Sequence, residues 1–200
     1  GIRNPAIVLI CIFFILAATI PFITKVEVET NIQEFFPPTH SLRKATDYIE
    51  EKLVGTTPLE IIFSTSSPDE EEAEILIQPE TLHYFKDLQS WLQKQPEVDK
   101  TVSVVDFIEE MNWGFHAQDD QFLSIPEDQN LISQYLFIYD GEDMYDFIDA
   151  DYQQARIAMN VNVHGANEIS DLMKKTEQYL KQQPLKNTQW RITGAGRLFA

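Results

Sequence analysis

The sequence has a single cysteine, Cys11, in 200 residues. No disulfide can form within the chain, and everything after the N-terminal region lacks thiol chemistry. Basic residues are also scarce, because 15 lysines and arginines stand against 32 aspartates and glutamates, which gives a formal net charge of −17. Binding to nucleic acid requires a concentration of positive charge, so the composition argues against nucleic acid as a partner. It argues equally against electrostatic docking on anionic lipid headgroups.

Motifs for catalysis and cofactor binding are missing as well. The sequence contains no GxGxxG, P-loop, HExxH or GxSxG pattern. The histidines, His40, His83, His116 and His164, lie far apart, and none has a second histidine or a cysteine at metal-ligand spacing. The carboxylates are so numerous that their count singles out no catalytic pair. We therefore expect no enzyme activity, no cofactor and no metal site, and we expect these histidines at surface or capping positions.

One long apolar run is present, over residues 6–24, and it contains no charged residue. As an α-helix it would be about 28 Å long, close to the ~30 Å hydrocarbon core of a bilayer. Its apolar side chains occupy every face, unlike those of a surface helix. We expect residues 1–25 to contain a transmembrane helix with its flank. A cleaved signal peptide and a buried core helix are the alternatives.

The charges beside this run bear on the side of the membrane. Arg3 is the only charge before the run, and the positive-inside rule assigns it to the cytoplasm. Lys25 at the other end opposes that bias, but large acidic domains cross membranes regardless of flanking charge. We expect residues 26–200 on the extracytoplasmic, periplasmic side of the inner membrane.

The apolar periodicity after the run predicts an α+β domain. Strands are expected over 58–65, 98–104, 154–163 and 188–193, and helices over 42–54, 79–95 and 167–183. Ser41 and Asn167 are the expected N-caps of the first and last of these helices. Alternation is clearest in the third strand, whose inward positions are expected to be Ala155, Ile157, Met159, Val161 and Val163.

These elements form two β-α-β halves, residues 58–104 and 154–193. Two such halves give the split β-α-β, or ferredoxin-like, arrangement, with both helices on one face of an antiparallel four-stranded sheet. Strand 154–163 should be central and pair with strands of both halves. Residues 105–153 are then a helical insertion, in which we expect the acidic stretch 140–152 to be a helix with a solvated face.

Several short motifs follow one another along nearly the whole chain. They are NIQEFFP at 31–37, SLR at 41–43, GTTPLE at 55–60, VDKTVSVVDFIEEMN at 98–112, ADYQQARIAMNV at 150–161 and ITGAGRLFA at 192–200. In this order and spacing the chain resembles the resistance-nodulation-division (RND) superfamily, specifically its MMPL-like branch of exporters. It departs at Gly55-Thr56, where a Gly-Gly-Thr is common in that branch.

The resemblance implies one extracytoplasmic porter domain of a twelve-helix, proton-driven transporter that exports lipids or other hydrophobic molecules. Arg3-Asn4-Pro5 resembles the start of the second half of such a transporter, and which half is present stays open. The implied partners are the lipid bilayer, a hydrophobic or lipid cargo and the second porter domain of the same full-length chain. The proton-relay carboxylates of the family lie in helices outside this sequence. The alternative is a single-pass, membrane-anchored binding or interaction domain without transport activity.

Four aromatic residues are candidates for a hydrophobic cargo path: Phe35, Phe36, Trp113 and Phe115. In the alternative interpretation they anchor the domain core or the membrane interface.

Overall fold

The computed structural model describes residues 10, 12–14, 35–65, 74–139, 141–194 and 197. The chain divides into two compact units, Gly1–Thr30 and Asn31–Ala200. The expected transmembrane stretch, 6–24, lies outside the described residues apart from Ile10 and residues 12–14. Nowhere in the described residues is a helix both long enough and apolar enough to span a bilayer.

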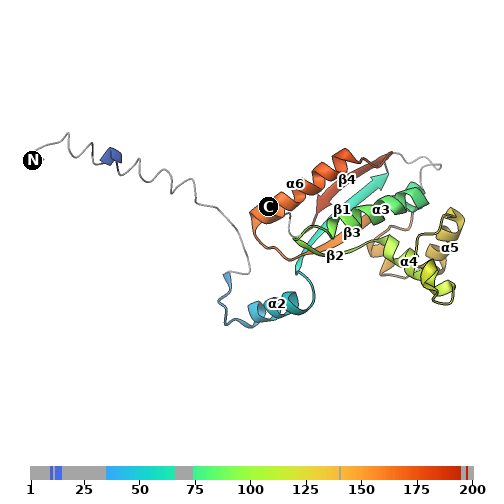
Figure 1. The fold of residues 1–200 in the computed structure, drawn as a ribbon, viewed down its shortest axis with the longest axis horizontal. Helices are drawn as coiled ribbons and strands as arrows, with labels where there is room; N and C mark the ends of the chain where they lie inside the picture. The colour runs from blue at the N-terminus through green and yellow to red at the C-terminus, as the bar shows by residue number, and fades with distance from the viewer. Residues whose placement is uncertain are drawn as a thin grey trace, which may run out of the picture. The chain divides into compact units, whose positions relative to one another are not determined.

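The second unit combines helices with one antiparallel sheet, so the expected α+β class is confirmed (Figure 1). In chain order its described elements are α2 (Ser41–Lys52), β1 (Thr57–Thr65), η2 (Ile75–Ile77), α3 (Pro79–Leu92), β2 (Val98–Val102), α4 (Val104–Phe115), η3 (Asp120–Phe122), α5 (Gln129–Tyr139), η4 (Met144–Asp146), β3 (Gln154–Val161), α6 (Ala166–Gln182) and β4 (Thr188–Thr193).

The four strands lie in the order β2-β3-β1-β4, with every neighbouring pair antiparallel. β3 is central, as expected. Both of its neighbours, β1 and β2, belong to the first half, so the expectation that it pairs with strands of both halves is wrong. β1 in turn lies between the two strands of the second half. The halves therefore interleave, and neither forms this sheet alone.

Helices α3 and α6 pack on the same face of the sheet. Trp91 of α3 stacks on Tyr179 of α6 with ring centroids 4.4 Å apart. The hydroxyl of Tyr84 donates a hydrogen bond to the backbone oxygen of Gln183, just after α6, at 2.8 Å. The two helices thus contact each other as well as the strands.

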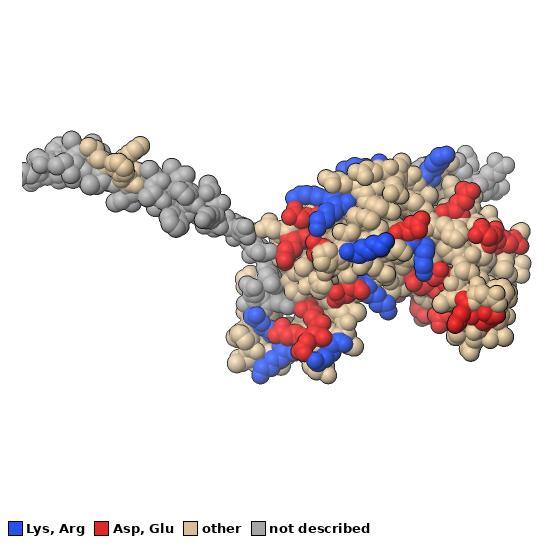
Figure 2. Space-filling model, in the orientation of Figure 1, with Lys and Arg blue, Asp and Glu red and all other residues tan. Residues whose placement is uncertain are grey.

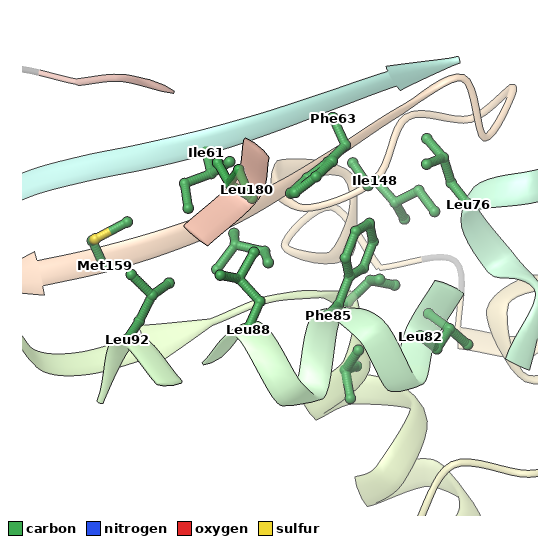
Figure 3. Close-up of a cluster of buried hydrophobic side chains, with 14 of the residues drawn as sticks. Ile61, Phe63, Leu76, Leu82, Phe85, Leu88, Leu92, Ile148, Met159 and Leu180 are labelled. Atoms are coloured by element: carbon green, nitrogen blue, oxygen red, sulfur yellow. The ribbon is translucent and has the colours of Figure 1, made fainter. Parts of the chain in front are cut away.

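The core lies between these helices and the sheet, and Figure 3 shows its centre. The inward face of β1 supplies Leu59, Ile61 and Phe63, all of which are fully buried. The ring of Phe63 lies against Phe85 of α3, with centroids 4.9 Å apart. From β3 the inward residues are Ala155, Ile157, Met159 and Val161, as the alternation predicts. Val163 follows the end of the strand and is only half-buried.

Both predicted N-caps are wrong by one or two residues. α2 begins at Ser41 itself, and His40 is its cap, with the imidazole Nδ1 accepting from the backbone N–H of Leu42 at 3.2 Å. A turn in which the N–H of His40 donates to the Pro37 oxygen fixes this position. α6 begins at Ala166, and Gly165 before it supplies the extended backbone of the cap position without a side-chain bond.

The insertion between the halves begins earlier than expected, because Ser103 ends β2 and caps α4. Its hydroxyl accepts from the N–H of Val105 at 3.1 Å, while the carboxylate of Asp106 accepts from the N–H of Ser103 at 2.8 Å. This reciprocal capping box is a strong helix start. The expected strand 98–104 therefore stops at Val102.

The expected helix over 140–152 is also wrong. Among residues 141–152, which are described, only η4 is helical. The carboxylate of Asp149 accepts from the N–H groups of Gln153 and Gln154 at 2.7 and 2.8 Å. Such side-chain bonds to the local backbone compete with helix formation, and here they lead the chain into β3.

Candidate functional site

The sheet face opposite α3 and α6 carries a cleft of about 300 Å³. Its floor comes from the outward residues of β1 and β3, including Glu60, Ile62 and Arg156, and its wall is the segment 145–149 of the insertion. Strand register determines this floor, since Ile62 lies directly opposite Arg156. The insertion thus reaches round to the face that the helices leave open.

Arg156 is the central charged group of this cleft. Its guanidinium lies 3.2 Å from a carboxylate oxygen of Glu60 and 3.9 Å from one of Asp146. It also lies over the ring of Phe147, 5.3 Å from the ring centroid. The Nε atom is buried and has no hydrogen-bond partner in the described part of the chain. The arrangement fastens the insertion to the sheet by a cation shared between two carboxylates and an aromatic ring.

A second pocket, of about 370 Å³, lies on α4 beside Trp113. Its lining consists of Asp106, Glu109, Glu110, Trp113, Asp120 and Leu123. The indole Nε1 donates to Asp120 at 3.2 Å, and Glu109 pairs with Lys86 of α3. An indole and a leucine rimmed by carboxylates suit an apolar group that carries a positive charge or hydrogen-bond donors.

A buried polar cluster keeps the helices that carry this pocket together. The amide of Asn112 on α4 donates to the backbone oxygen of Ser124 at 2.9 Å, and its oxygen accepts from the hydroxyl of Tyr135 on α5 at 3.0 Å. Asn112 is buried, so these partners satisfy groups that would otherwise be costly to desolvate. The insertion is therefore a packed part of the second unit.

The four predicted cargo-path aromatics do not meet in one place. Phe35 is exposed, and Phe36 is half-buried with its ring 4.9 Å from that of His40. Trp113 lines the second pocket, whereas Phe115 is exposed and stacks on Tyr135 at 5.3 Å. Figure 1 shows α2, which follows the first pair, well separated from α4, which carries the second. Phe35 and Phe36 therefore lie apart from Trp113 and Phe115, and a cargo path lined by these side chains stays a prediction.

Sequence reasoning missed the contacts that attach α2 to the end of β3. Nε2 of His164 lies 2.9 Å from Glu50 of α2, an ion-pair distance without the alignment of a hydrogen bond. Nδ1 of the same ring is 2.7 Å from the hydroxyl of Thr57, and Glu50 also accepts from the hydroxyl of Thr56. His164 is far from Glu50 in sequence, so no local pattern could have paired them.

Tyr84 and Glu97 are titratable groups whose pKa values are shifted by packing and by a neighbouring charge. Burial, and to a lesser extent the nearby Tyr179, raises the pKa of Tyr84 to about 12. Burial alone would raise the pKa of Glu97, but the hydrogen bond and charge of Lys175 outweigh it, and the pKa is lowered. Neither group lines either pocket, so neither marks a catalytic acid or base.

Metal ligation finds no support in the geometry of the described residues, which nowhere bring together three or more histidine, cysteine, aspartate or glutamate side chains in a metal-binding group. No protein-family model and no curated protein matches the sequence of this chain.

Proposed function

We propose that residues 26–200 form an extracytoplasmic porter domain of an RND-type, MMPL-like transporter that exports lipids or other hydrophobic molecules. Residues 6–24 supply the transmembrane helix before it. The observation that carries this assignment is the interleaving of two β-α-β halves in one sheet, with the strand order β2-β3-β1-β4. Together with α3 and α6 on one face, this order supports a ferredoxin-like, split β-α-β domain with an insertion between its halves.

The motifs behind the family resemblance fall on residues with demanding structural roles. A Cβ added to Gly55 would lie 2.1 Å from the backbone oxygen of Val161, so only glycine fits there. The N–H of Gly55 donates to Asp99 at 2.7 Å, and its oxygen accepts from the amide of Asn160 at 3.1 Å. The GTTPLE segment therefore joins β1 to β2 and β3, which favours a fold-specific motif over a chance match.

The ADYQQARIAMNV segment supports the same interpretation. Its arginine, Arg156, fastens the insertion to the open sheet face through Glu60 and Asp146. In transporters of this kind, binding surfaces form between repeated domains, and gating is the motion of one repeat against another. An open sheet face with mixed polar and apolar side chains is suited to bear on a second porter domain of the same chain.

The test has a genetic and a biochemical part. Reading the gene beyond codon 200 should reveal several further apolar runs and a second copy of this domain. A stop codon shortly after that point would overturn the proposal. The full-length protein, reconstituted in vesicles, should move a fluorescent lipid or hydrophobic dye when a proton gradient is imposed, and a protonophore should abolish the movement. Transport of the lipid or dye that does not depend on the proton gradient would contradict proton coupling.

A further inference from the structure

Helix α2 exposes the apolar stripe that an amphipathic helix ordinarily buries. The stripe consists of Leu42, Ala45 and Ile49, at the spacing of one helix face, together with Leu53 at the C-cap. The exposed fractions are 53% for Leu42, 39% for Ile49 and 73% for Leu53. None of the residues of α2, all of which are described, is buried. The stripe needs a partner that lies outside the described residues.

The attachment of α2 to the rest of the unit comes from another side of the helix. Glu50 contacts His164 and Thr56, and the guanidinium of Arg43 donates to the backbone oxygen of Phe36 at 3.1 Å. Glu50 and Arg43 are seven residues apart, so they lie on the same side, about 100° around the helix from the stripe. The stripe therefore faces outward while the polar side holds the helix in place.

The charge of α2 also sets it apart from the rest of the chain. Its cations are Arg43, Lys44 and Lys52, and its anions are Asp47, Glu50 and Glu51, so its net charge is zero. The whole chain carries −17. In Figure 2, blue and red side chains alternate around α2, whereas red predominates over α4 and α5. Anionic lipid headgroups would repel the acidic surface but not this helix.

The short segment between the apolar run and α2 keeps the stripe close to the bilayer in which the run is proposed to lie. Residues 25–40, sixteen in all, separate the apolar run from α2. Even fully extended, they span at most about 58 Å. A helix tethered at that distance meets the bilayer surface at a high effective concentration. The tether includes Phe35, which is 76% exposed. Tyr48 beside the stripe is also exposed, as is typical of tyrosine at membrane interfaces.

A second copy of the chain is a poorer occupant. The stripe has four side chains on a helix about 18 Å long. A stable interface needs about 800 Å² from each partner, which is more than such a stripe offers. Lipid imposes no such requirement, because each apolar side chain enters the acyl boundary independently.

We propose that α2 is an interfacial helix that lies on the outer surface of the membrane, with Leu42, Ile49 and Leu53 inserted below the phospholipid headgroups. The inference rests on the proposed transmembrane helix within residues 6–24. Through Glu50 and His164 the embedded helix fixes the orientation of the sheet relative to the bilayer.

Nitroxide labels on the full 200-residue chain in phosphatidylcholine vesicles test this placement. The variants are Ile49→Cys in the stripe, Asp47→Cys on the opposite side of the helix and Phe14→Cys in the apolar run, each with Cys11→Ser. Collisions with oxygen report lipid, and collisions with a water-soluble nickel chelate report water. We expect the labels at 14 and 49 to be in lipid and the label at 47 in water. In the Ile49→Cys chain, adding Leu53→Glu should raise nickel accessibility about tenfold, the effect of about 1.4 kcal/mol.

Each other outcome overturns the inference in a distinct way. If the label at 14 is in lipid while the labels at 47 and 49 are equally in water, the transmembrane helix is supported and the interfacial helix is refuted. If the labels at 14 and 49 are both in water, the transmembrane helix is refuted as well. A label at 49 that neither oxygen nor nickel reaches means that protein, and not lipid, covers the stripe.

Discussion

Two adjacent isoleucines on β1 provide a direct test of the sheet's orientation. Ile61 points to the helices and is fully buried, opposite Ile157 of β3. Ile62 points to the open face and is half-buried, between Arg156 and Arg191 in the strand register. Replacing each in turn by alanine removes the same atoms from the same central strand. We expect a much larger loss of stability from Ile61→Ala.

The expected loss in the free energy of unfolding depends on whether each substitution leaves a closed cavity or an open surface. Ile61→Ala removes three buried carbons at about 0.8 kcal/mol each and leaves a closed cavity, so the free energy of unfolding should fall by about 3–5 kcal/mol. Ile62→Ala removes carbons that are already partly in water, beside an open cleft, and should cost about 1 kcal/mol. The lost β-propensity is similar at both sites and cancels in the comparison. The difference of about 2–4 kcal/mol therefore measures burial.

Urea unfolding of residues 31–200, followed by tryptophan fluorescence, is the suitable assay. The fragment comprises the compact second unit, which holds the entire described core. If Ile61→Ala does not fold, Ile61→Val gives a smaller step of about 0.5–1.5 kcal/mol at the same site. Equal losses at the two positions, or a larger loss at Ile62, would refute the assigned register and with it the orientation of the sheet.

Three further predictions follow from other features. Gly55→Ala should lower the free energy of unfolding in urea by about 3 kcal/mol, because the added Cβ would collide with backbone atoms. At Gly114 an added Cβ meets no atom within 4 Å, so Gly114→Ala should stabilise α4 by about 0.5–1 kcal/mol, and equal effects at the two sites would contradict the close approach at Gly55. The neutral form of Tyr84 contributes stability that is present below the unfolded pKa of about 10 and is lost as the pH rises through its folded pKa of about 12. Tyr84→Phe should therefore flatten the fall in unfolding free energy between about pH 10 and 12, and an unchanged slope would assign the fall to other groups. A reporter enzyme that is active only in the periplasm should be active when fused after Asn187, in the exposed turn before β4, and labelling of that site from the cytoplasm would refute the proposed topology.

Local patterns predicted those parts of the fold that depend on which side of an element is buried. Alternation in β3 identified Ala155, Ile157, Met159 and Val161 as inward, because one register keeps the polar residues out of the core. The helix expected over 79–95 is α3, and it begins at Pro79 as expected, because proline is favoured at the first helical position. In these elements the apolar side chains are the buried ones, so the sequence alone predicts which side of the element faces the core.

Contacts between distant residues could not be predicted in this way. Alternation in β3 implies that Arg156 points away from the inward residues, as it does, but nothing near it in sequence indicated Glu60 as its partner. The caps failed for a related reason, since Ser41 has the right chemistry but the turn at Pro37 brings His40 to the helix start. Among the cargo-path candidates, Trp113 and Phe115 share α4 but face different neighbours, because two residues correspond to about 200° around a helix.

The interleaved sheet makes the second unit a single mechanical body. β1 is held on both edges by strands of the second half, and β3 on both edges by strands of the first. Separating the halves would break every strand pairing in the sheet and part Trp91 of α3 from Tyr179 of α6. Arg156 fastens the insertion to the same body through Asp146 and Phe147, and the hydroxyl of Ser103, which caps α4, donates to Gln89 of α3. A force applied at α2 through Glu50 and His164 would therefore move the sheet, the helices and the insertion together, as the proposed porter domain requires.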